Sequence, residues 1–112
     1  MKENLYLIEL WNDKERFYKI GVTVHRFCRF YQIMKVGYRA KIIFMIMGID
    51  PFEAYKAEQI LHSSFESYSP QIKFGGHREC FVNIEMEFYK AYALYLISGY
   101  KKIVENIEIS WR

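Results

Sequence analysis

The sequence contains no run of 18 or more uncharged apolar residues, the length that a membrane-spanning helix requires. Its longest apolar run, residues 42–48, has only the length of a strand. The first residues, MKENLYLIELWND, lack the long apolar segment and the small-residue cleavage site of a secretory signal peptide. We therefore expect a soluble, cytoplasmic protein with no membrane partner.

Cysteine, proline and glycine are also scarce, with two, two and six residues respectively. No linker rich in Pro or Ser interrupts the chain, so its length of 112 residues predicts one domain over 1–112. Cys28 and Cys80 could form one disulfide by count, but we favour free thiols in a reducing compartment.

The residues that are abundant are the apolar ones. Hydrophobic residues make up 52% of the chain and aromatic residues 19%, which predicts a buried core and excludes a disordered chain. The formal net charge of +3 is mildly basic. It permits an anionic partner such as nucleic acid, and it equally fits an ordinary surface with a few additional lysines.

The spacing of apolar residues predicts the order of the elements. Residues 4–10 (NLYLIEL) are apolar on both alternating faces, which predicts a central strand. Phe27, Phe30, Tyr31 and Met34 have the spacing of an amphipathic helix. We predict an α+β fold with a three-stranded, mostly antiparallel sheet flanked by helices, in the order β-β-α-β-α, loop and C-terminal helix. The predicted elements are strand 4–10, strand 17–23, helix 24–35, strand 40–49, helix 51–66, a short strand or extended piece at 80–82 and helix 84–104.

Two of the predicted helices begin with recognisable capping residues. Asp50 can be the N-cap of helix 51–66, Pro51 fits its first position, and Glu53 can complete a capping box. Asn83 can cap the last helix.

Glu58 is unusual because it falls near the middle of the apolar face of helix 51–66. At about 100° per residue, Ala54, Leu61 and Phe65 all lie within about 60° of it. A half-buried carboxylate is costly unless it is paired or binds a metal. Glu58 is therefore either a metal ligand or general base, or one half of a salt bridge with a core arginine.

Arg26 and Arg29 lie three residues apart and share one face of helix 24–35. A guanidinium matches two phosphate oxygens, so this pair could bind phosphate. The alternative is a solvated basic face. Tyr6 and Tyr18, on the first two strands, are either ordinary buried tyrosines or members of a site with the arginine and the glutamate.

Zinc is a further alternative. Two His-x-x-Cys pairs, His25 with Cys28 and His77 with Cys80, flank His62 in the sequence, and zinc accepts such ligands. However, Cys28 falls inside a predicted helix, where a small core residue explains it as well.

The ordered set of these residues resembles the GIY-YIG nuclease superfamily, specifically its phage and bacterial branch with Lys-Ile-Gly in the second motif. The resemblance covers about residues 5–81. Tyr6 takes the tyrosine position of the first motif, with Asn4 in place of its glycine. In the second motif, KIG, Lys19 takes the place of a tyrosine and Gly21 matches the glycine.

Later residues continue the resemblance. Arg29 fits the arginine of the following helix, and Glu58 fits the glutamate that binds the divalent metal. The string AEQILHSSF resembles the Ala-Glu-x-x-Leu-His-x-x-Phe pattern of the branch, which includes His62. GGHRECF resembles its Gly-x-x-Glu-x-Phe ending, which places Glu79.

The resemblance implies a metal-dependent endonuclease that hydrolyses DNA phosphodiester bonds with Mg²⁺ or Mn²⁺. Glu58 would hold the metal, and Tyr6 would position or deprotonate the attacking water. Lys19 and Arg29 would provide positive charge, and His62 would share proton transfer or support the metal. The implied nucleic-acid-binding residues are Lys19, Gly21, Arg26 and Arg29.

Two other functions remain open. One is a non-cleaving nucleic-acid-binding or regulatory protein that keeps the fold, because a fold does not fix a function. The other is an interaction protein that forms a homodimer through aromatic residues of the C-terminal helix. This segment contains more tyrosines than one core-facing stripe needs, namely Tyr89, Tyr92, Tyr95 and Tyr100.

Overall fold

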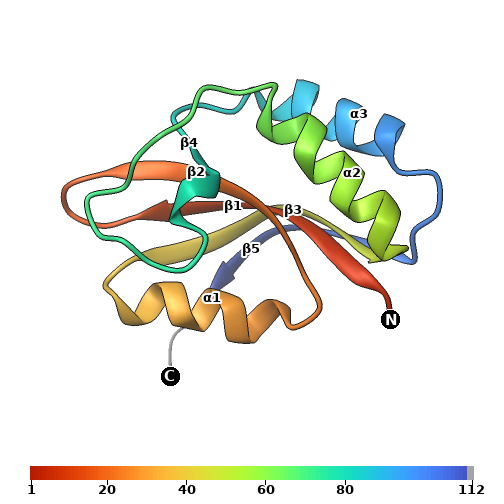
Figure 1. Cartoon of the computed structure of the whole chain (residues 1–112). Helices are drawn as coiled ribbons and strands as arrows, with labels where there is room; N and C mark the ends of the chain where they lie inside the picture. The colour runs from red at the N-terminus through yellow and green to blue at the C-terminus, as the bar shows by residue number, and fades with distance from the viewer. Residues whose placement is uncertain (111–112) are drawn as a thin grey trace.

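The structure is a computed structural model that describes residues 1–110, apart from the side chains of Arg26 and Phe27. Its elements form three layers, with α2 and α3 on one side of a sheet and α1 on the other (Figure 1). The elements are β1 (Glu3–Trp11), β2 (Arg16–Thr23), α1 (Arg26–Lys35), β3 (Arg39–Ile49), α2 (Pro51–His62), the 3₁₀ helix η1 (His77–Glu79), β4 (Cys80–Phe81), α3 (Met86–Leu96) and β5 (Lys102–Ile109).

The sheet has five strands in the order β4-β2-β1-β3-β5, and all neighbours are antiparallel. The α+β class and the order of the first five elements agree with the sequence analysis, but the predicted three-stranded sheet is wrong. β1 is the central strand. Its Leu5 and Leu7 pack toward α2 and α3, whereas Tyr6, Ile8 and Leu10 pack toward α1. This alternation explains why both faces of β1 are apolar.

β5 is the longer of the two strands that the predicted three-stranded sheet lacked. The predicted helix 84–104 ends at Leu96, and the chain then forms a strand that pairs with β3 from Ala40↔Ile109 to Met47↔Lys102. Gly99 interrupts the helical pattern, and the segment KIVENIEI is rich in the β-branched residues that favour strands. β5 also covers the long edge of β3, which would otherwise present unpaired backbone groups.

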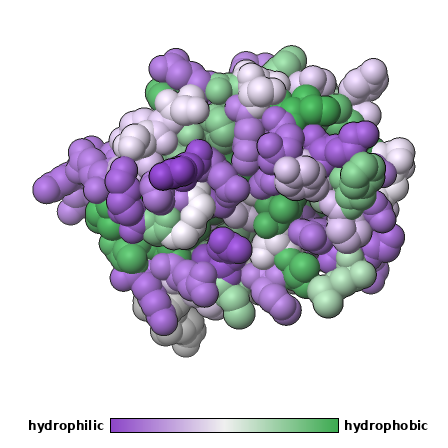
Figure 2. All heavy atoms as spheres, in the orientation of Figure 1, coloured by the Kyte–Doolittle hydropathy of each residue, from purple (hydrophilic) through white to green (hydrophobic). Residues whose placement is uncertain are grey.

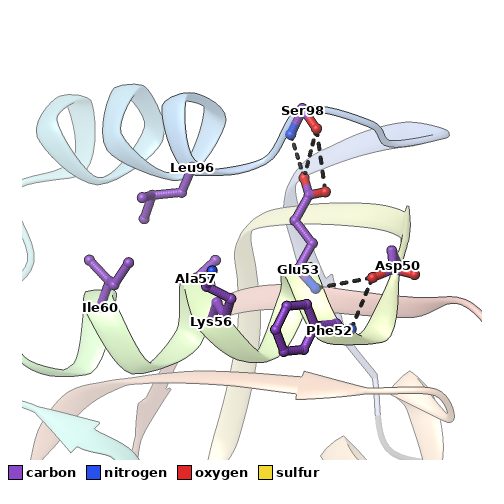
Figure 3. A pocket seen from close by; sticks show the side chains of 8 residues that line it. All are labelled: Asp50, Phe52, Glu53, Lys56, Ala57, Ile60, Leu96 and Ser98. Atoms are coloured by element: carbon purple, nitrogen blue, oxygen red, sulfur yellow. Dashed lines mark hydrogen bonds between the residues drawn. The ribbon is translucent and has the colours of Figure 1, made fainter.

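α2 begins as predicted. The Asp50 side chain accepts hydrogen bonds from the backbone N–H groups of Phe52 and Glu53, and Pro51 occupies the first turn. Glu53 does not complete a capping box, because its carboxylate instead accepts hydrogen bonds from the backbone and hydroxyl of Ser98 (Figure 3). This contact links α2 to the segment after α3, beside a hollow of about 450 Å³ that Ile60 and Leu96 help to line. The helix ends at His62, four residues before the predicted end.

α3 begins two residues later than predicted. Its N-cap is Glu85 rather than Asn83, and the Glu85 carboxylate accepts hydrogen bonds from the backbone N–H groups of Glu87 and Phe88. Within residues 1–110, no helix is both long enough and apolar enough to cross a membrane.

Glu15 fixes the long segment between α2 and η1 against the sheet. Its carboxylate accepts hydrogen bonds from the hydroxyls of Tyr38 and Tyr68, both at 2.5 Å, and from the backbone N–H of Gln71 at 3.1 Å. Burial alone would raise the pKa of Glu15, but these three donors lower it below its ordinary value. The hydrogen bond to Glu15 in turn raises the pKa of Tyr68 to about 12. The ionised carboxylate is therefore the form that the fold stabilises.

We expect Glu15→Gln to lower the free energy of unfolding at neutral pH by about 1.5–3 kcal/mol, because hydrogen bonds to a charged acceptor are lost. Urea denaturation would measure the change, with the exposed Glu66→Gln as a matched control that shifts stability by less than about 0.5 kcal/mol. Because the folded pKa of Glu15 is lowered, its contribution is present above the unfolded pKa and is lost as the pH falls through the folded pKa. A Glu15→Gln effect that persists unchanged in acid would contradict this account.

Candidate functional site

The candidate site lies along the edge of β2 that faces β4. β4 pairs only with Tyr18 and Lys19, so the rest of that edge has no neighbouring strand among residues 1–110. Side chains of α2 cover it instead. The imidazole Nε2 of His62 donates to the Ile20 carbonyl at 2.8 Å, and the Glu58 carboxylate accepts from the backbone N–H of Val22.

Lys19 is at the centre of this site and its side chain is only 1% exposed. Its ammonium group donates a hydrogen bond to the Tyr6 hydroxyl oxygen at 2.5 Å and another to Glu79 Oε1 at 3.0 Å. The ammonium also lies 4.9 Å from the centre of the Tyr6 ring. A buried ammonium is costly unless it is paired, and these contacts supply the pairing. They join β1, β2 and η1 at one point.

The protonation states of this pair follow from its surroundings. Burial alone would lower the pKa of Lys19, but Tyr6 and Glu79 raise it above its ordinary value. Burial raises the pKa of Tyr6, and Lys19 and Arg29 only partly offset this effect. At neutral pH the site therefore holds a charged lysine and a protonated tyrosine.

Two glycines leave the space that this arrangement occupies. A Cβ atom at Gly21 would lie 2.5 Å from the Tyr6 hydroxyl oxygen and 3.0 Å from Lys19 Nζ. A Cβ atom at Gly76 would lie 2.8 Å from Lys19 Cε, and Gly76 also has a φ of +84° that disfavours other residues. Gly21 therefore allows the tyrosine to cross the backbone of β2, and Gly76 allows η1 to approach the lysine.

Glu58, His62 and Glu79 converge beside the Lys19 ammonium. One ligand atom from each lies within 4.8 Å of the others, and this is the one such group of three or more potential metal ligands within the described part of the chain. Glu58 is 5% exposed, and no arginine pairs with it in the described structure. Its contact with a basic side chain is to His62 Nε2, at 3.9 Å, and the predicted alternative of a salt bridge with a core arginine is not found among the described side chains.

The electrostatics of this group favour a cation. Burial, and then the neighbouring Glu79 carboxylate, raise the pKa of Glu58, although His62, Lys19 and the Val22 N–H group act in the opposite direction. A divalent cation would relieve the repulsion between the two carboxylates, whose oxygens are the ligands that Mg²⁺ prefers. His62 already uses Nε2 to bind the Ile20 carbonyl, so only Nδ1 remains free for a metal or a proton. The residues therefore fit a hard divalent cation.

Arg29 lies on α1, close enough to Tyr6 for its charge to oppose the rise in the pKa of that phenol. Its side chain helps to line a hollow of about 170 Å³ with Thr23, His25 and Cys28. Among the described residues, Arg29 has no ion pair and no side-chain hydrogen bond, so its guanidinium is available to a ligand. The predicted role of Arg26 concerns a side chain outside the described structure.

The other candidate residues do not join this site. Tyr18 packs toward the α2 and α3 face, opposite Lys19, as the alternation of the strand predicts. Cys28 is exposed and Cys80 is buried, and both are free thiols. The two His-x-x-Cys pairs do not form a group with His62 among the described residues, so the zinc alternative is not supported.

Two features of the site were missing from the sequence-based interpretation. The first is the ion pair between Glu79 and Lys19, which joins residues 60 positions apart. The motif GGHRECF pointed to Glu79 but not to its partner. The second feature is Tyr89, which is fully buried and has the one buried side-chain polar atom without a hydrogen-bond partner in the described structure. Burial first, and then Tyr6 and Glu58, raise the pKa of Tyr89.

Comparison of the chain with protein-family models, with curated proteins and with solved structures finds no match. The resemblance to GIY-YIG nucleases therefore stays a prediction that rests on the motifs and on the site geometry.

We expect Gly21→Ala to lower the free energy of unfolding by about 1–3 kcal/mol, because the added methyl group would overlap the Tyr6 hydroxyl. Chemical denaturation would measure this change. Gly99→Ala is the matched control, because a Cβ atom there meets no atom within 4 Å. Equal stability of the Gly21→Ala and Gly99→Ala variants would show that the tyrosine does not cross the glycine as described.

Proposed function

We propose that this protein is a metal-dependent endonuclease of the GIY-YIG type that hydrolyses DNA phosphodiester bonds. The observation that carries the proposal is that a tyrosine hydroxyl, a buried ammonium and a group of potential metal ligands converge at one edge of β2, with an arginine nearby on α1. The four residues come from four different elements: Tyr6 from β1, Lys19 from β2, Arg29 from α1 and Glu58 from α2. The resemblance assigns each of them a part in phosphodiester hydrolysis.

Glu58 and Glu79 would hold one Mg²⁺ or Mn²⁺ ion. When bound, the ion would polarise the phosphate and stabilise the negative charge on the leaving oxygen. Glu58 is the better-fixed ligand, because α2 holds it at the edge of β2 through the Val22 N–H group. Glu79 is also the partner of Lys19, so a metal ion and the lysine would share its carboxylate.

Tyr6 would act on the attacking water. In its ionised form the phenolate oxygen would accept a proton from water as the water oxygen attacks phosphorus. Lys19 already donates a hydrogen bond to this oxygen, so the ammonium would stabilise the phenolate without moving. Arg29 would bind the non-bridging oxygens of the phosphate, where negative charge increases in the transition state.

A second candidate is a nucleic-acid-binding or regulatory protein that does not cleave. The observation that favours it is the environment of Tyr6. Burial raises the pKa of this phenol despite the adjacent lysine, so little phenolate is present at neutral pH without a further cation. In this alternative, Lys19 and Arg29 would bind phosphate, and the acidic group would not support catalysis.

The homodimer through the C-terminal helix also stays a proposal. Of the tyrosines on α3, Tyr89 is buried in the core, whereas Tyr95 is 82% exposed. Phe88 is exposed as well, so α3 still presents an aromatic surface, although a smaller one than the sequence predicts.

We expect the wild type to nick supercoiled plasmid DNA in Mg²⁺ or Mn²⁺ and to lose this activity in EDTA. Tyr6→Phe removes the proton acceptor and should slow nicking by about 10²–10⁴-fold. Glu58→Gln removes a metal ligand and should abolish it. Gel electrophoresis of time points would measure the rates.

The matched controls are Tyr100→Phe and Glu66→Gln, which alter exposed residues outside the site and should leave the rate unchanged. Thermal denaturation would verify that all four variants fold. DNA binding by the wild type with no nicking in either metal would refute the nuclease proposal and support the second candidate.

A further inference from the structure

A basic hollow lies beside the candidate site, on the segment that connects α2 to β4. Its volume is about 470 Å³. Its described lining contains basic and polar residues and no acidic residue: Ser67, Tyr68, Ser69, Lys73, His77 and Arg78. Lys73 and Arg78 are exposed, and the described structure shows no carboxylate paired with either. Two unpaired cations with neighbouring hydroxyls are the groups that bind a phosphate.

One wall of the hollow is held by backbone pairing. Ser67 forms an antiparallel bridge with Phe81 of β4, and the backbone N–H of Tyr68 donates to the Cys80 carbonyl at 2.8 Å. The Tyr68 hydroxyl is fixed by Glu15, and its ring stacks on Phe17 at 5.1 Å. The segment that carries the two serines is therefore attached to the sheet.

The basic side chains are also partly preorganised. The Lys73 ammonium donates to the Ser69 hydroxyl at 3.1 Å and to the Pro70 carbonyl at 3.5 Å, and both Lys73 and Ser69 line the hollow. The imidazole Nδ1 of His77 donates to the Phe74 carbonyl at 2.8 Å, so Nε2 is free for a ligand. Arg78 follows on η1 and has no intramolecular partner among the described residues.

The 3₁₀ helix η1 links residues that line the hollow to residues of the candidate site. Gly76, immediately before His77, approaches Lys19 so closely that a Cβ atom would lie 3.1 Å from Nζ. Glu79, immediately after Arg78, is the ion-pair partner of the same lysine. One short helical turn thus connects the basic hollow to the proposed catalytic group. Hydrophilic side chains are interspersed with apolar ones on the face of the molecule that carries η1 and α1 (Figures 1 and 2).

We propose that this hollow binds a backbone phosphate of the nucleic-acid strand whose scissile phosphate lies at Lys19 and Arg29. The inference rests on the proposed function and adds a binding position for a second phosphate of the strand. Lys73 and Arg78 bind the flanking phosphate, and η1 sets its position relative to Tyr6 and Glu58. Such a contact positions the strand and carries no sequence information. Its loss weakens binding to all sequences equally.

The test compares Lys73→Gln/Arg78→Gln with the wild type and with Lys101→Gln/Lys102→Gln. The control removes the same charge near β5, at the opposite edge of the sheet from β4. Fluorescence anisotropy with a labelled DNA duplex in EDTA gives the affinity at several salt concentrations. We expect the pocket variant to bind roughly tenfold more weakly and the magnitude of the slope of log K against log salt to fall by about 0.9, the contribution of one phosphate. The control should match the wild type.

Two further readouts separate failure of this inference from failure of the proposed function. The pocket variant should raise KM for nicking and leave kcat unchanged, because Lys73 and Arg78 do not act on the scissile phosphate. If the wild type nicks DNA and the pocket variant binds and nicks equally well, the inference is wrong and the nuclease proposal stands.

A titration with inorganic phosphate, followed by the backbone amide NMR signals of Ser67, Ser69 and Arg78, tests the hollow without DNA. If phosphate shifts these signals but the wild type binds no DNA, the hollow serves a free phosphate compound and the inference is overturned. In that case the nuclease proposal fails for lack of a substrate, independently of the hollow.

Discussion

The buried ammonium of Lys19 is the interaction on which the site depends. A lysine that is 1% exposed can keep its charge only if oxygen atoms replace the water that it loses. Tyr6 supplies one oxygen from β1. Glu79 supplies the other from η1, 60 residues after Lys19 in the chain. This requirement fixes the tyrosine hydroxyl over Gly21 and holds η1 against β2. The same contacts place Glu79 beside Glu58, so the potential metal ligands converge because the lysine must be neutralised.

Two groups at the site lower the stability of the folded protein, and the proposed function explains why they are present. Burial and Glu79 both disfavour the ionised form of Glu58, and the Tyr89 hydroxyl beneath the site has no partner in the described structure. The structural carboxylate of Glu15 has a different environment. Three hydrogen-bond donors surround it and lower its pKa. Crowded like charges with raised pKa values are typical of binding and catalytic sites. The contrast between Glu15 and Glu58 supports the assignment of Glu58 to function.

Local signals predicted part of the fold and the burial of Glu58. The apolar faces of residues 4–10 indicated a central strand, Asp50 and Pro51 located the start of α2, and helical spacing placed Glu58 on the buried face. The sequence was less informative where long-range pairing decides the structure. β5 is stabilised by pairing with the edge of β3, whose backbone N–H and C=O groups would otherwise be unpaired. The local pattern of apolar residues after residue 96 does not indicate this long-range pairing. The pairing of Glu79 with Lys19 is equally non-local, and only the fold brings the two residues together.

The ionisation of Lys19 tests the central claim most directly. NMR of lysine labelled with ¹³C at Cε, assigned with a Lys19→Arg variant, would follow this one ammonium group as the pH rises. We predict that Lys19 stays charged at pH values above 10.5, the ordinary pKa of lysine, and that Glu79→Gln lowers the pKa of Lys19. A Lys19 that is already neutral between about pH 7 and 9, with no response to Glu79→Gln, would contradict the account. That result would mean that burial, and not pairing with Tyr6 and Glu79, controls the centre of the site.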